Sequence, residues 1–320
     1  MRKKITNLID LLEVKREVSS DLNQYKYIIN LCSGGGCIST DSIKIRDLLI
    51  SELERAGLNS DVKINETGCM GICAKGPVMI IEPEGVFYCE IRPDDVKRIV
   101  DEHLKKGRIV ESLCYRDEEK GELVPYWKDI DFFKRQKKIV LSNCGNIDYR
   151  SIEQYIANDG YLALGKILTA EISPEQVIEE VKKSGLRGRG GAGFPTGLKW
   201  SLARKSPASE KFVICNADEG DPGAFMDRSI LEGDPHSVIE GMIIAAYAVG
   251  AKKGYVYVRA EYPLAVERLN YAIKQAKERG LLGERIFNTD FSFDLEIRIG
   301  AGAFVCGEET ALIASIEGMR

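Results

Sequence analysis

Four cysteines in the first quarter of the chain have the spacing of a metal-binding site. Four residues separate Cys32 from Cys37, three residues separate Cys69 from Cys73, and each pair encloses glycine. Neither spacing is the C-x-x-C of a thioredoxin redox pair, and thiols in a reducing compartment serve metals more often than disulfides. Structural zinc tolerates such spacing but fits the glycine-rich, apolar surroundings less well. The quartet therefore favours a [2Fe-2S] cluster on four thiolates, with zinc or unrelated thiols as the alternatives.

A glycine-rich run over residues 185–200 is suited to holding an anion. Six of its sixteen residues are glycine, and Arg187, Arg189 and Lys199 lie among them. Glycine costs extra entropy to order, so such a concentration is expected where backbone approaches a ligand closely or adopts positive φ. A phosphate-bearing cofactor is the leading interpretation, and a purely structural linker is the alternative.

The run contains a formal G-x-G-x-x-G at Gly188, Gly190 and Gly193, but its context is not that of a dinucleotide fingerprint. That fingerprint leaves a strand and opens a helix. Here a helix with Ser173 as its N-cap is expected to enter the run and to end at Gly185. The run also lacks the adjacent Gly-Lys-Ser/Thr of a P-loop. We therefore expect a phosphate cradle of a third kind.

Two further segments place polar groups at the ends of expected elements. A strand over residues 211–215 runs into N-A-D-E-G-D-P-G at 216–223, and a small-residue turn at 300–307 opens a helix at Glu308 and Glu309. Ligands of α/β proteins bind at the carboxyl ends of strands. The aspartates could instead hold Mg²⁺ or form turns, and the glutamates could merely cap the helix. With the glycine-rich run, the segments fit a large nucleotide-like cofactor better than a bare metal ion.

The elements around the cysteines have the order of a thioredoxin-like domain. Hydrophobic periodicity and turn signals predict strands over 27–32, 62–64, 78–81 and 86–91, and helices over 42–56 and 93–106. The glycine-rich run belongs to an alternating pattern. Strands are expected over 211–215, 254–259 and 293–299, and helices over 235–249 and 264–279. Alternation of this kind predicts a parallel sheet in a Rossmann-like α/β domain.

The rest of the chain is expected to support these two domains. Residues 1–18 predict an amphipathic helix with Ile5, Leu8 and Leu12 on its apolar face, and residues 111–150 an extended connector pinned to a neighbouring surface by its aromatic side chains. His103 and His236 are the only histidines, and we expect them at the surface or at helix caps rather than in catalysis.

Composition excludes several classes of function. The net charge of −4 leaves no basic field for nucleic acid. The longest apolar stretch, residues 242–249, falls far short of the about 20 residues that a membrane-spanning helix needs. Nine cysteines without a secretory signal predict a cytoplasmic protein.

These motifs resemble a known family of flavoproteins. Residues 32–73 are similar to the thioredoxin-like [2Fe-2S] ferredoxin domain of NADH dehydrogenases. The segments N-A-D-E-G-D-P-G-A-F-M-D-R (216–228) and G-A-G-A-F-V-C-G-E-E-T-A-L (300–312) resemble the FMN-binding subunit of complex I-like NADH dehydrogenases, and most closely that of NAD(P)-reducing and electron-bifurcating hydrogenases. The implied plan is a [2Fe-2S] domain with an N-terminal helix over 1–108, a connector over 109–160, and an FMN- and NAD(P)H-binding domain over 161–320.

The resemblance implies roles for individual residues. Around the flavin and its phosphate it places Gly188, Arg189, Gly190, Gly191 and Lys199. The rest of the flavin pocket would comprise Asn216, Asp218, Glu219, Gly307 and Glu308. Phe194 would stack on the dinucleotide, and Asp221 with Glu309 would face NAD(P)H. The expected catalytic residues are Glu219 and Asp221.

The implied activity is hydride transfer between NAD(P)H and FMN, followed by one-electron transfer to iron-sulfur clusters of a larger complex. Its partners would be a hydrogenase catalytic subunit and a small [2Fe-2S] subunit. The alternatives are a non-catalytic [2Fe-2S] carrier or assembly module and a zinc-stabilised interaction protein. Phe304, Asp221 and Leu202 depart from the residues usual in respiratory members, which leaves the choice between NADH and NADPH open. Family members continue beyond residue 320 with further cofactor motifs, so we expect a partial chain.

Overall fold

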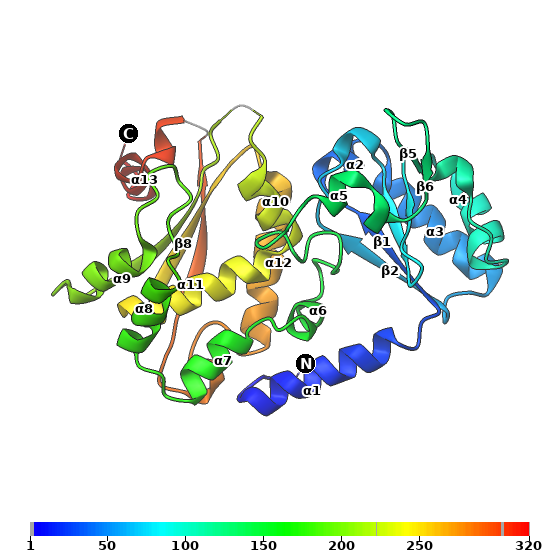
Figure 1. Ribbon diagram of the computed structural model, residues 1–320. Helices are drawn as coiled ribbons and strands as arrows, with labels where there is room; N and C mark the ends of the chain where they lie inside the picture. Colours follow the sequence, from blue (N-terminus) through cyan, green and yellow to red (C-terminus); the bar gives the residue numbers. More distant parts are fainter. Residues whose placement is uncertain (1–2, 222, 302–303, 320) are drawn as a thin grey trace. The chain divides into compact units, whose positions relative to one another are not determined.

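The computed structural model describes residues 3–221, 223–301 and 304–319, and its chain divides into two compact units (Figure 1). We call residues 16–155 with 232–234 the cysteine unit, because it carries the cysteine quartet. Residues 1–15, 156–231 and 235–320 form the glycine-loop unit, which carries the glycine-rich run. Pro222, Gly302 and Ala303, which belong to two of the predicted cofactor segments, lie outside the described residues.

A mixed four-stranded sheet forms the centre of the cysteine unit. Its strands are β1 (Tyr27–Cys32), β2 (Val62–Thr67), β3 (Met79–Glu82) and β4 (Val86–Tyr88), in the order β2-β1-β3-β4. Strands β1 and β2 are parallel, and β1, β3 and β4 pair antiparallel, so the predicted hairpin is confirmed. The prediction ended β2 three residues too early, at Ile64. The added residues are polar, but pairing with β1 buries them and Asn65 donates to the Asn30 side chain at 3.0 Å.

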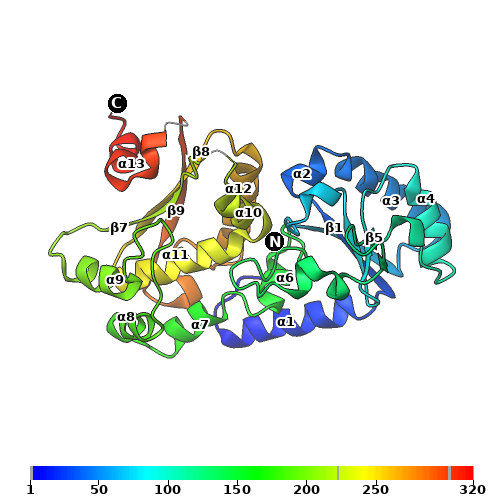
Figure 2. The same ribbon diagram turned by 45° about the horizontal axis from the view of Figure 1, so that its top comes forward.

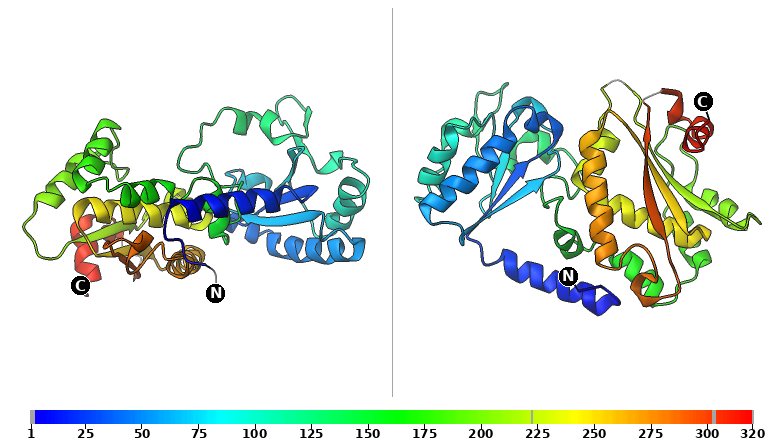
Figure 3. Two further views of the ribbon diagram at one scale, coloured as in Figure 1. Left: turned by 90° about the horizontal axis from the view of Figure 1, so that it is seen from below. Right: turned by 180° about the vertical axis from the view of Figure 1, so that it is seen from behind.

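Helices cover one face of this sheet and the connector covers the other (Figure 3). These helices are α3 (Ser42–Ala56) and α4 (Asp95–Arg98), which continues as a π-helical turn, η2 (Ile99–Leu104). The short helix α2 (Gly35–Ile38) instead contributes Cys37 to the core on the connector side. The predicted helix over 93–106 is therefore shorter and changes its winding. On the α3 side, Ile45, Leu49 and Leu53 pack with the alternate sheet residues Met79 and Ile81 in one core.

The connector packs against the opposite face through its aromatic residues, as predicted. Its short elements are η3 (Glu111–Leu113), β5 (Tyr115–Arg116), β6 (Leu123–Val124), η4 (Trp127–Asp129) and α5 (Asp131–Lys134). Phe133 packs edge-on against Phe87 of β4 at 5.6 Å between ring centroids, and Trp127 packs against Phe133. The second core that results contains Cys32 and Cys37. The connector thus closes the side of the sheet on which the first cysteine pair lies.

A parallel three-stranded sheet forms the centre of the glycine-loop unit. Strands β7 (Phe212–Ala217), β8 (Lys253–Arg259) and β9 (Asp294–Gly300) lie in that order. Both pairings are parallel, which confirms the predicted α/β topology. Helices α11 (Pro235–Val249) and α12 (Pro263–Glu278) flank this sheet and pack against each other, with His236 Nε2 3.2 Å from the Gln275 side chain (Figures 1 and 3). Within the described ranges, no helix has the length and apolar character that crossing a membrane requires.

Helices α8 (Pro174–Lys183) and α9 (Thr196–Lys205) flank the glycine-rich run and pack against each other (Figure 2). Ser173 caps α8 in the predicted capping box with Gln176, and Gly185 has a φ of +69° just beyond the helix end. The other elements are α1 (Leu8–Leu22), α6 (Ile152–Ala157), α7 (Leu162–Thr169), α10 (Met226–Gly233), α13 (Glu309–Ile316), η1 (Cys73–Lys75), η5 (Ile286–Asn288) and η6 (Phe304–Gly307).

The apolar face predicted for the first helix is partly wrong. Helix α1 begins at Leu8 rather than at the chain start. Ile5, which precedes it, and Leu11 are buried, but Leu12 is 54% exposed. The side chains of Leu8 and Leu11 pack so closely on Gly165 of α7 that a Cβ there would lie 2.7 Å from Leu8. Contact with α7 therefore selects the buried face, and the spacing of apolar residues alone does not reveal it.

Both histidines are buried, which corrects the prediction that they lie at the surface or at caps. The Nδ1 of His103 lies 2.8 Å from the Tyr88 hydroxyl, and the Nδ1 of His236 lies 2.9 Å from the Tyr161 hydroxyl. Burial lowers the pKa of each imidazole, that of His236 to about 4. Hydrogen bonds to tyrosines allow these neutral rings to be buried, and both rings serve as core residues.

Candidate functional site

The four cysteines of the quartet lie on separate turns around one end of the cysteine unit's sheet. Cys32 ends β1 and Cys37 lies in α2, and both thiols are almost fully buried. Cys69 follows β2, and Cys73 begins η1 at an exposed position. The parallel pairing of β1 with β2 ends at Cys32 and Thr67, which brings the two cysteine loops to the same edge of the sheet.

The four sulfur atoms form a chain of close pairs. The Sγ atoms of Cys69 and Cys73 lie 3.6 Å apart, and the thiol of Cys32 interacts with those of Cys37 and Cys69. The contact with Cys37 raises the pKa of Cys32 to about 12, and the contact with Cys32 raises the pKa of Cys69. Like charges at such distances oppose ionisation. The quartet therefore needs a cation among the sulfurs before all four can be thiolates.

Backbone amides already point at three of the sulfurs. The amide of Gly71 donates to Cys69 Sγ at 3.3 Å. A backbone hydrogen bond from Gly34 opposes the rise in the pKa of Cys32. Contact with Cys32, together with a backbone hydrogen bond from Val78, lowers the pKa of Cys37. Amide donors of this kind stabilise metal-bound thiolates and tune the potentials of iron-sulfur clusters. The loops thus hold the sulfurs in the environment that a cluster requires.

Three glycines around the two cysteine pairs leave little or no room for a side chain. A Cβ added at Gly34 would lie 2.9 Å from Cys69 Cβ, one at Gly76 would lie 3.1 Å from Cys37 Sγ, and one at Gly36 would lie 3.3 Å from Cys73 Sγ. The glycine content noted in the sequence therefore has a steric cause, since glycine lets each loop come close to the sulfurs of the other cysteines.

The pairing of the sulfurs fits the ligand pattern of a [2Fe-2S] cluster. A [2Fe-2S] cluster spreads four thiolates over two irons, so two close pairs suffice. The pairs Cys32–Cys37 and Cys69–Cys73 meet that requirement.

The glycine-rich run forms an exposed hairpin-like loop between α8 and α9. The amide of Gly188 donates to the Phe194 carbonyl at 2.9 Å, and that of Thr196 donates to the Leu186 carbonyl at 2.9 Å. At the tip, Gly191 has a φ of +100°, which only glycine adopts without strain. A Cβ at Gly190 would meet nothing within 4 Å. Protein packing therefore does not require glycine at residue 190.

Cationic side chains surround this loop. Arg187 donates to the Gly193 carbonyl at 3.0 Å, which stiffens the loop. Arg189 and Lys199 are exposed, and neither forms an ion pair with another described residue. Phe194 is 46% exposed on the same loop. The loop thus offers backbone amides, two free positive charges and an apolar ring, the groups that a phosphate-bearing aromatic cofactor uses.

The two other predicted segments meet at the carboxyl end of β7. The Asn216 side chain donates to the Gly307 carbonyl at 2.8 Å, across 91 residues of sequence. A Cβ at Gly307 would lie 3.6 Å from the Asp218 carbonyl. Buried at the same place, Asp218 Oδ2 has no hydrogen-bond partner among the described residues, and desolvation raises the pKa of this carboxyl. An orphan acceptor at a strand end is the position at which an N–H or O–H of a cofactor would bind.

Two of the predicted glutamates act as helix caps in this structure. Glu219 accepts hydrogen bonds from the amides of Asp227 and Arg228 at the start of α10. Glu308 accepts from the amides of Thr310 and Ala311 at the start of α13, and these bonds lower its pKa. Both caps fix the turns that carry the candidate cofactor-binding residues.

The remaining predicted residues, Asp221 and Glu309, are exposed. In the described residues the hydrogen bonds of the glycine-rich loop stay within the loop and its flanking residues, and none reaches Asn216 or Glu308. The structure therefore joins two of the three predicted segments directly. The third remains a separate loop of the same unit.

Two residues of this site were not predicted from the sequence. Arg259 ends β8, donates to the Glu219 carbonyl, and places Nε 3.9 Å from Asp218 Oδ1. The Tyr262 hydroxyl donates to Glu219 Oε2 at 3.2 Å. Because β8 lies beside β7 in the sheet, the rule that ligands bind at strand ends could have found Arg259.

Comparison with known families confirms the predicted fold class. Residues 20–104 match the family described as thioredoxin-like [2Fe-2S] ferredoxin. Residues 181–320 match the family described as Nuo51 FMN-binding domain. The predicted cofactors FMN and [2Fe-2S] agree with these two family descriptions.

Similar proteins confirm the resemblance to subunits of NAD(P)-reducing hydrogenases and NADH dehydrogenases. The chain is 61% identical over 187 residues to the NADP-reducing hydrogenase subunit HndC of Solidesulfovibrio fructosivorans, covering 58% of this chain and 38% of that protein. It is 50% identical over 182 residues to an NADH-quinone oxidoreductase subunit of Rhizobium meliloti, covering 57% and 43%. It is 40% identical over 256 residues to the NAD-reducing hydrogenase HoxS subunit alpha of Cupriavidus necator, covering 80% and 40%. The chain spans less than half the length of each relative.

Proposed function

We propose that this chain belongs to the flavin subunit of an NAD(P)H-oxidising complex. Support comes from the two families that it matches in succession, the thioredoxin-like [2Fe-2S] ferredoxin and the Nuo51 FMN-binding domain. The reaction is hydride transfer between NAD(P)H and FMN, coupled to one-electron transfer to iron-sulfur clusters. Bound FMN supplies the chemistry that turns a two-electron step into single-electron steps. One observation carries the proposal. The same chain holds a paired thiol quartet and, in its other unit, a strand-end junction with an unsatisfied buried carboxylate.

The thiol quartet is proposed to hold the [2Fe-2S] cluster. Cys32 and Cys37 would bind one iron, and Cys69 and Cys73 the other; the 3.6 Å distance between the Cys69 and Cys73 sulfurs and the contact of Cys32 with Cys37 support this assignment. The backbone donors from Gly34, Val78 and Gly71 would stabilise the thiolates. The near-complete burial of the first pair would keep water away from one side of the cluster.

The glycine-loop unit is proposed to hold FMN through two groups of residues. The phosphate would lie on the loop, among Gly188, Arg189, Gly190, Gly191 and Lys199. The flavin ring would lie at the strand end, against Asn216, Asp218, Glu219, Gly307 and Glu308. Asp218 Oδ2 is the best supported of these contacts, since it is buried and lacks a donor.

NAD(P)H is proposed to bind on the exposed side of the same site. Phe194 would stack on its aromatic ring, and Asp221 and Glu309 would contact its ribose or nicotinamide. Two backbone amides and the Tyr262 hydroxyl hold Glu219 in place. In this arrangement Glu219 would position the flavin site next to the reacting atoms. Asp221 is the exposed carboxylate closest in sequence to Glu219.

The complex is proposed to be cytoplasmic and to contain a hydrogenase catalytic subunit and a small [2Fe-2S] subunit as partners. Support comes from the names of the relatives, two of which are hydrogenase subunits. None of the nine cysteines, all of which the structure describes, is in a disulfide, which agrees with a reducing compartment.

Anaerobic reconstitution tests this function. The chain is purified with iron and sulfide, FMN is added, and iron content, the visible spectrum and ferricyanide reduction by NADH or NADPH are measured. Bound flavin together with turnover is the expected result. A cluster without flavin would favour the carrier or assembly module, and zinc without iron would favour the zinc-stabilised interaction protein.

A further inference from the structure

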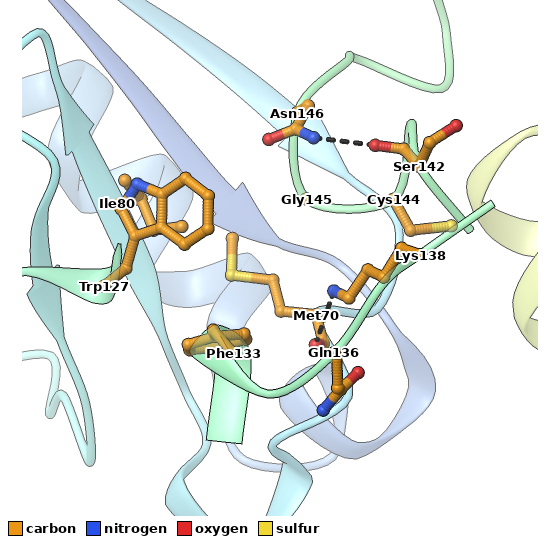
Figure 4. Close-up of a pocket in the computed structure, with 10 residues that line it drawn as sticks. All are labelled: Met70, Ile80, Trp127, Phe133, Gln136, Lys138, Ser142, Cys144, Gly145 and Asn146. Carbon is orange, nitrogen blue, oxygen red and sulfur yellow. Dashed lines mark hydrogen bonds between the residues drawn. The ribbon is translucent and has the colours of Figure 1, made fainter. Parts of the chain in front are cut away.

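A cavity of about 220 Å³ lies against the second cysteine loop within the cysteine unit (Figure 4). Its lining includes Met70, Trp127, Phe133, Lys138 and Cys144. Met70 follows the proposed cluster ligand Cys69 directly in the sequence. The walls are otherwise mostly apolar, so a charged group in this cavity acts in a medium that screens it less than bulk water does.

Lys138 is the cation of this cavity, and its ammonium group is tied to the cluster loop. Nζ donates to the Met70 carbonyl at 3.3 Å, a contact that Figure 4 draws. It also lies 5.5 Å from the centre of the Phe133 ring. The side chain is half-buried, whereas its neighbour Lys137 is exposed. The connector therefore directs one lysine inward, toward the loop that carries Cys69, and the adjacent lysine outward.

The charge of Lys138 faces thiols rather than carboxylates. Burial lowers the pKa of the ammonium group, and the opposing influences come from Cys144, Cys69 and Cys32. Among the described residues no Asp or Glu contributes to that balance. Two of these three thiols belong to the proposed cluster ligands. An inward-facing cation that contacts the loop carrying Cys69 has an electrostatic effect on whatever the quartet binds.

We propose that Lys138 raises the reduction potential of the [2Fe-2S] cluster, as a positioning charge that touches neither iron nor sulfide. The inference rests on the proposed function, because it presupposes the cluster. On reduction one electron enters the cluster from an external donor, no covalent bond forms or breaks, and the net negative charge of the site grows by one. A fixed positive charge nearby stabilises the reduced form more than the oxidised form.

The size of the cavity limits the effect of Lys138 on the reduction potential. The cavity is large enough for several water molecules, which screen the charge of Lys138 in part. We therefore expect removal of the charge to change the reduction equilibrium by about tenfold, which is ~59 mV for a one-electron couple. A larger change would require a dry contact between Nζ and the cluster.

The test is a redox titration of the reconstituted full chain, followed by the visible and electron paramagnetic resonance signals of the cluster. The variants are Lys138→Gln, which removes the charge, and Lys138→Arg, which keeps it. Lys137→Gln is the matched control, since it removes a positive charge one residue away from an exposed position. Lys138→Gln should lower the potential, and Lys138→Arg and Lys137→Gln should leave it near that of the parent.

Two results would overturn the inference. One is an intact cluster whose potential in Lys138→Gln equals that of the parent. The other is an equal fall in potential for Lys137→Gln, which would indicate only the net charge of the protein. Should Lys138→Gln lose the cluster, Lys138→Met retains the apolar stem against Phe133 and is titrated in its place. Absence of iron and of the cluster spectrum in the parent chain is a different failure, that of the proposed function.

Discussion

The cysteine loops and the glycine-rich loop both contain many glycines, but the structural reason for glycine differs between them. At Gly34, Gly36 and Gly76 an added Cβ would press on a cysteine of the quartet. At Gly190 and Gly191 an added Cβ would meet no protein atom within 4 Å. Contacts inside the protein explain the glycines of the cysteine loops. Backbone conformation and the proposed cofactor explain those of the glycine-rich loop. Composition alone does not separate these two uses of glycine.

The comparison also explains which site the fold prepares more completely. The sulfurs of the quartet lie within contact of one another and already accept hydrogen bonds from backbone amides. In the other unit, Asn216 ties two segments together, but the loop that would hold the phosphate bonds only within itself and its flanks in the described residues. Packing therefore organises the proposed cluster site, whereas the proposed flavin site combines a fixed strand-end junction with an exposed loop.

The largest effect is expected from removing a cluster ligand. Cys32→Ala deletes the sulfur that contacts both Cys37 and Cys69, so most of the iron and the visible cluster spectrum should be lost. FMN binding should persist, because the flavin residues lie in the other unit. Cys89→Ala, which removes a buried thiol outside the quartet, is the control and should retain its iron. Full iron content in Cys32→Ala would show that the quartet is not the cluster site.

The next largest effect is expected for the pH dependence of stability, which His236 in the core of the glycine-loop unit causes. Burial lowers the pKa of His236 from 6.5 to about 4, so the unfolded chain binds the proton more tightly than the folded one. Stability is then full above pH 6.5 and falls as the pH drops toward 4, by about 3 kcal/mol in total at 1.36 kcal/mol per pKa unit.

Denaturant unfolding at a series of pH values measures this loss. A Trp127→Phe background leaves Trp200 as the only tryptophan, which reports on the glycine-loop unit. His236→Gln should flatten the dependence between pH 6.5 and 4. An unchanged slope in that variant would mean that other groups cause the acid sensitivity of this unit.

Substitutions at two adjacent glycines test whether steric contact with the quartet requires glycine. Gly34→Ala would place Cβ 2.9 Å from Cys69 Cβ, so we expect a loss of about 1–3 kcal/mol in stability and a reduced cluster content. Gly35→Ala meets nothing within 4 Å and should be neutral or slightly stabilising. Urea unfolding and iron analysis of the two variants distinguish them. Equal behaviour would contradict the close approach of the two loops.

The smallest effect is expected at the glycine-rich loop. Gly190→Ala should leave the free energy of unfolding unchanged within about 0.5 kcal/mol, because nothing in the protein opposes the methyl group. If the backbone there approaches the flavin phosphate, FMN affinity should fall by about tenfold, or 1.4 kcal/mol. Flavin fluorescence titration measures it. Gly241→Ala, on the exposed side of α11 with no neighbour within 4 Å, is the control and should bind FMN normally.

Motifs with local causes could be predicted from the sequence. The capping box at Ser173 and Gln176 formed as expected, because its groups are three residues apart. The alternation of strands and helices predicted the parallel sheet for the same reason, since each element reflects its own periodicity. The pairing of the cysteines was also predicted, since the members of each pair share one short loop.

Contacts between distant segments could not be predicted in this way. The burial of His103 and His236, the face of α1 that packs on Gly165, and the length of β2 all depend on neighbours far away in the chain. Lys138 gave no signal in the sequence, where it is one of several lysines in a polar connector. Its inward direction follows from the packing of Phe133 on the sheet.

By itself the sequence determined the chemistry that this protein can perform, because residue type and short spacing decide which groups are available as ligands, caps and donors. The tertiary structure decided which of those groups meet. It brought Asn216 to Gly307 across 91 residues, left Asp218 Oδ2 buried without a donor, and placed Lys138 beside the cysteine loop. The physical reason is that burial and electrostatic environment depend on distance in space, which periodicity along the chain does not specify.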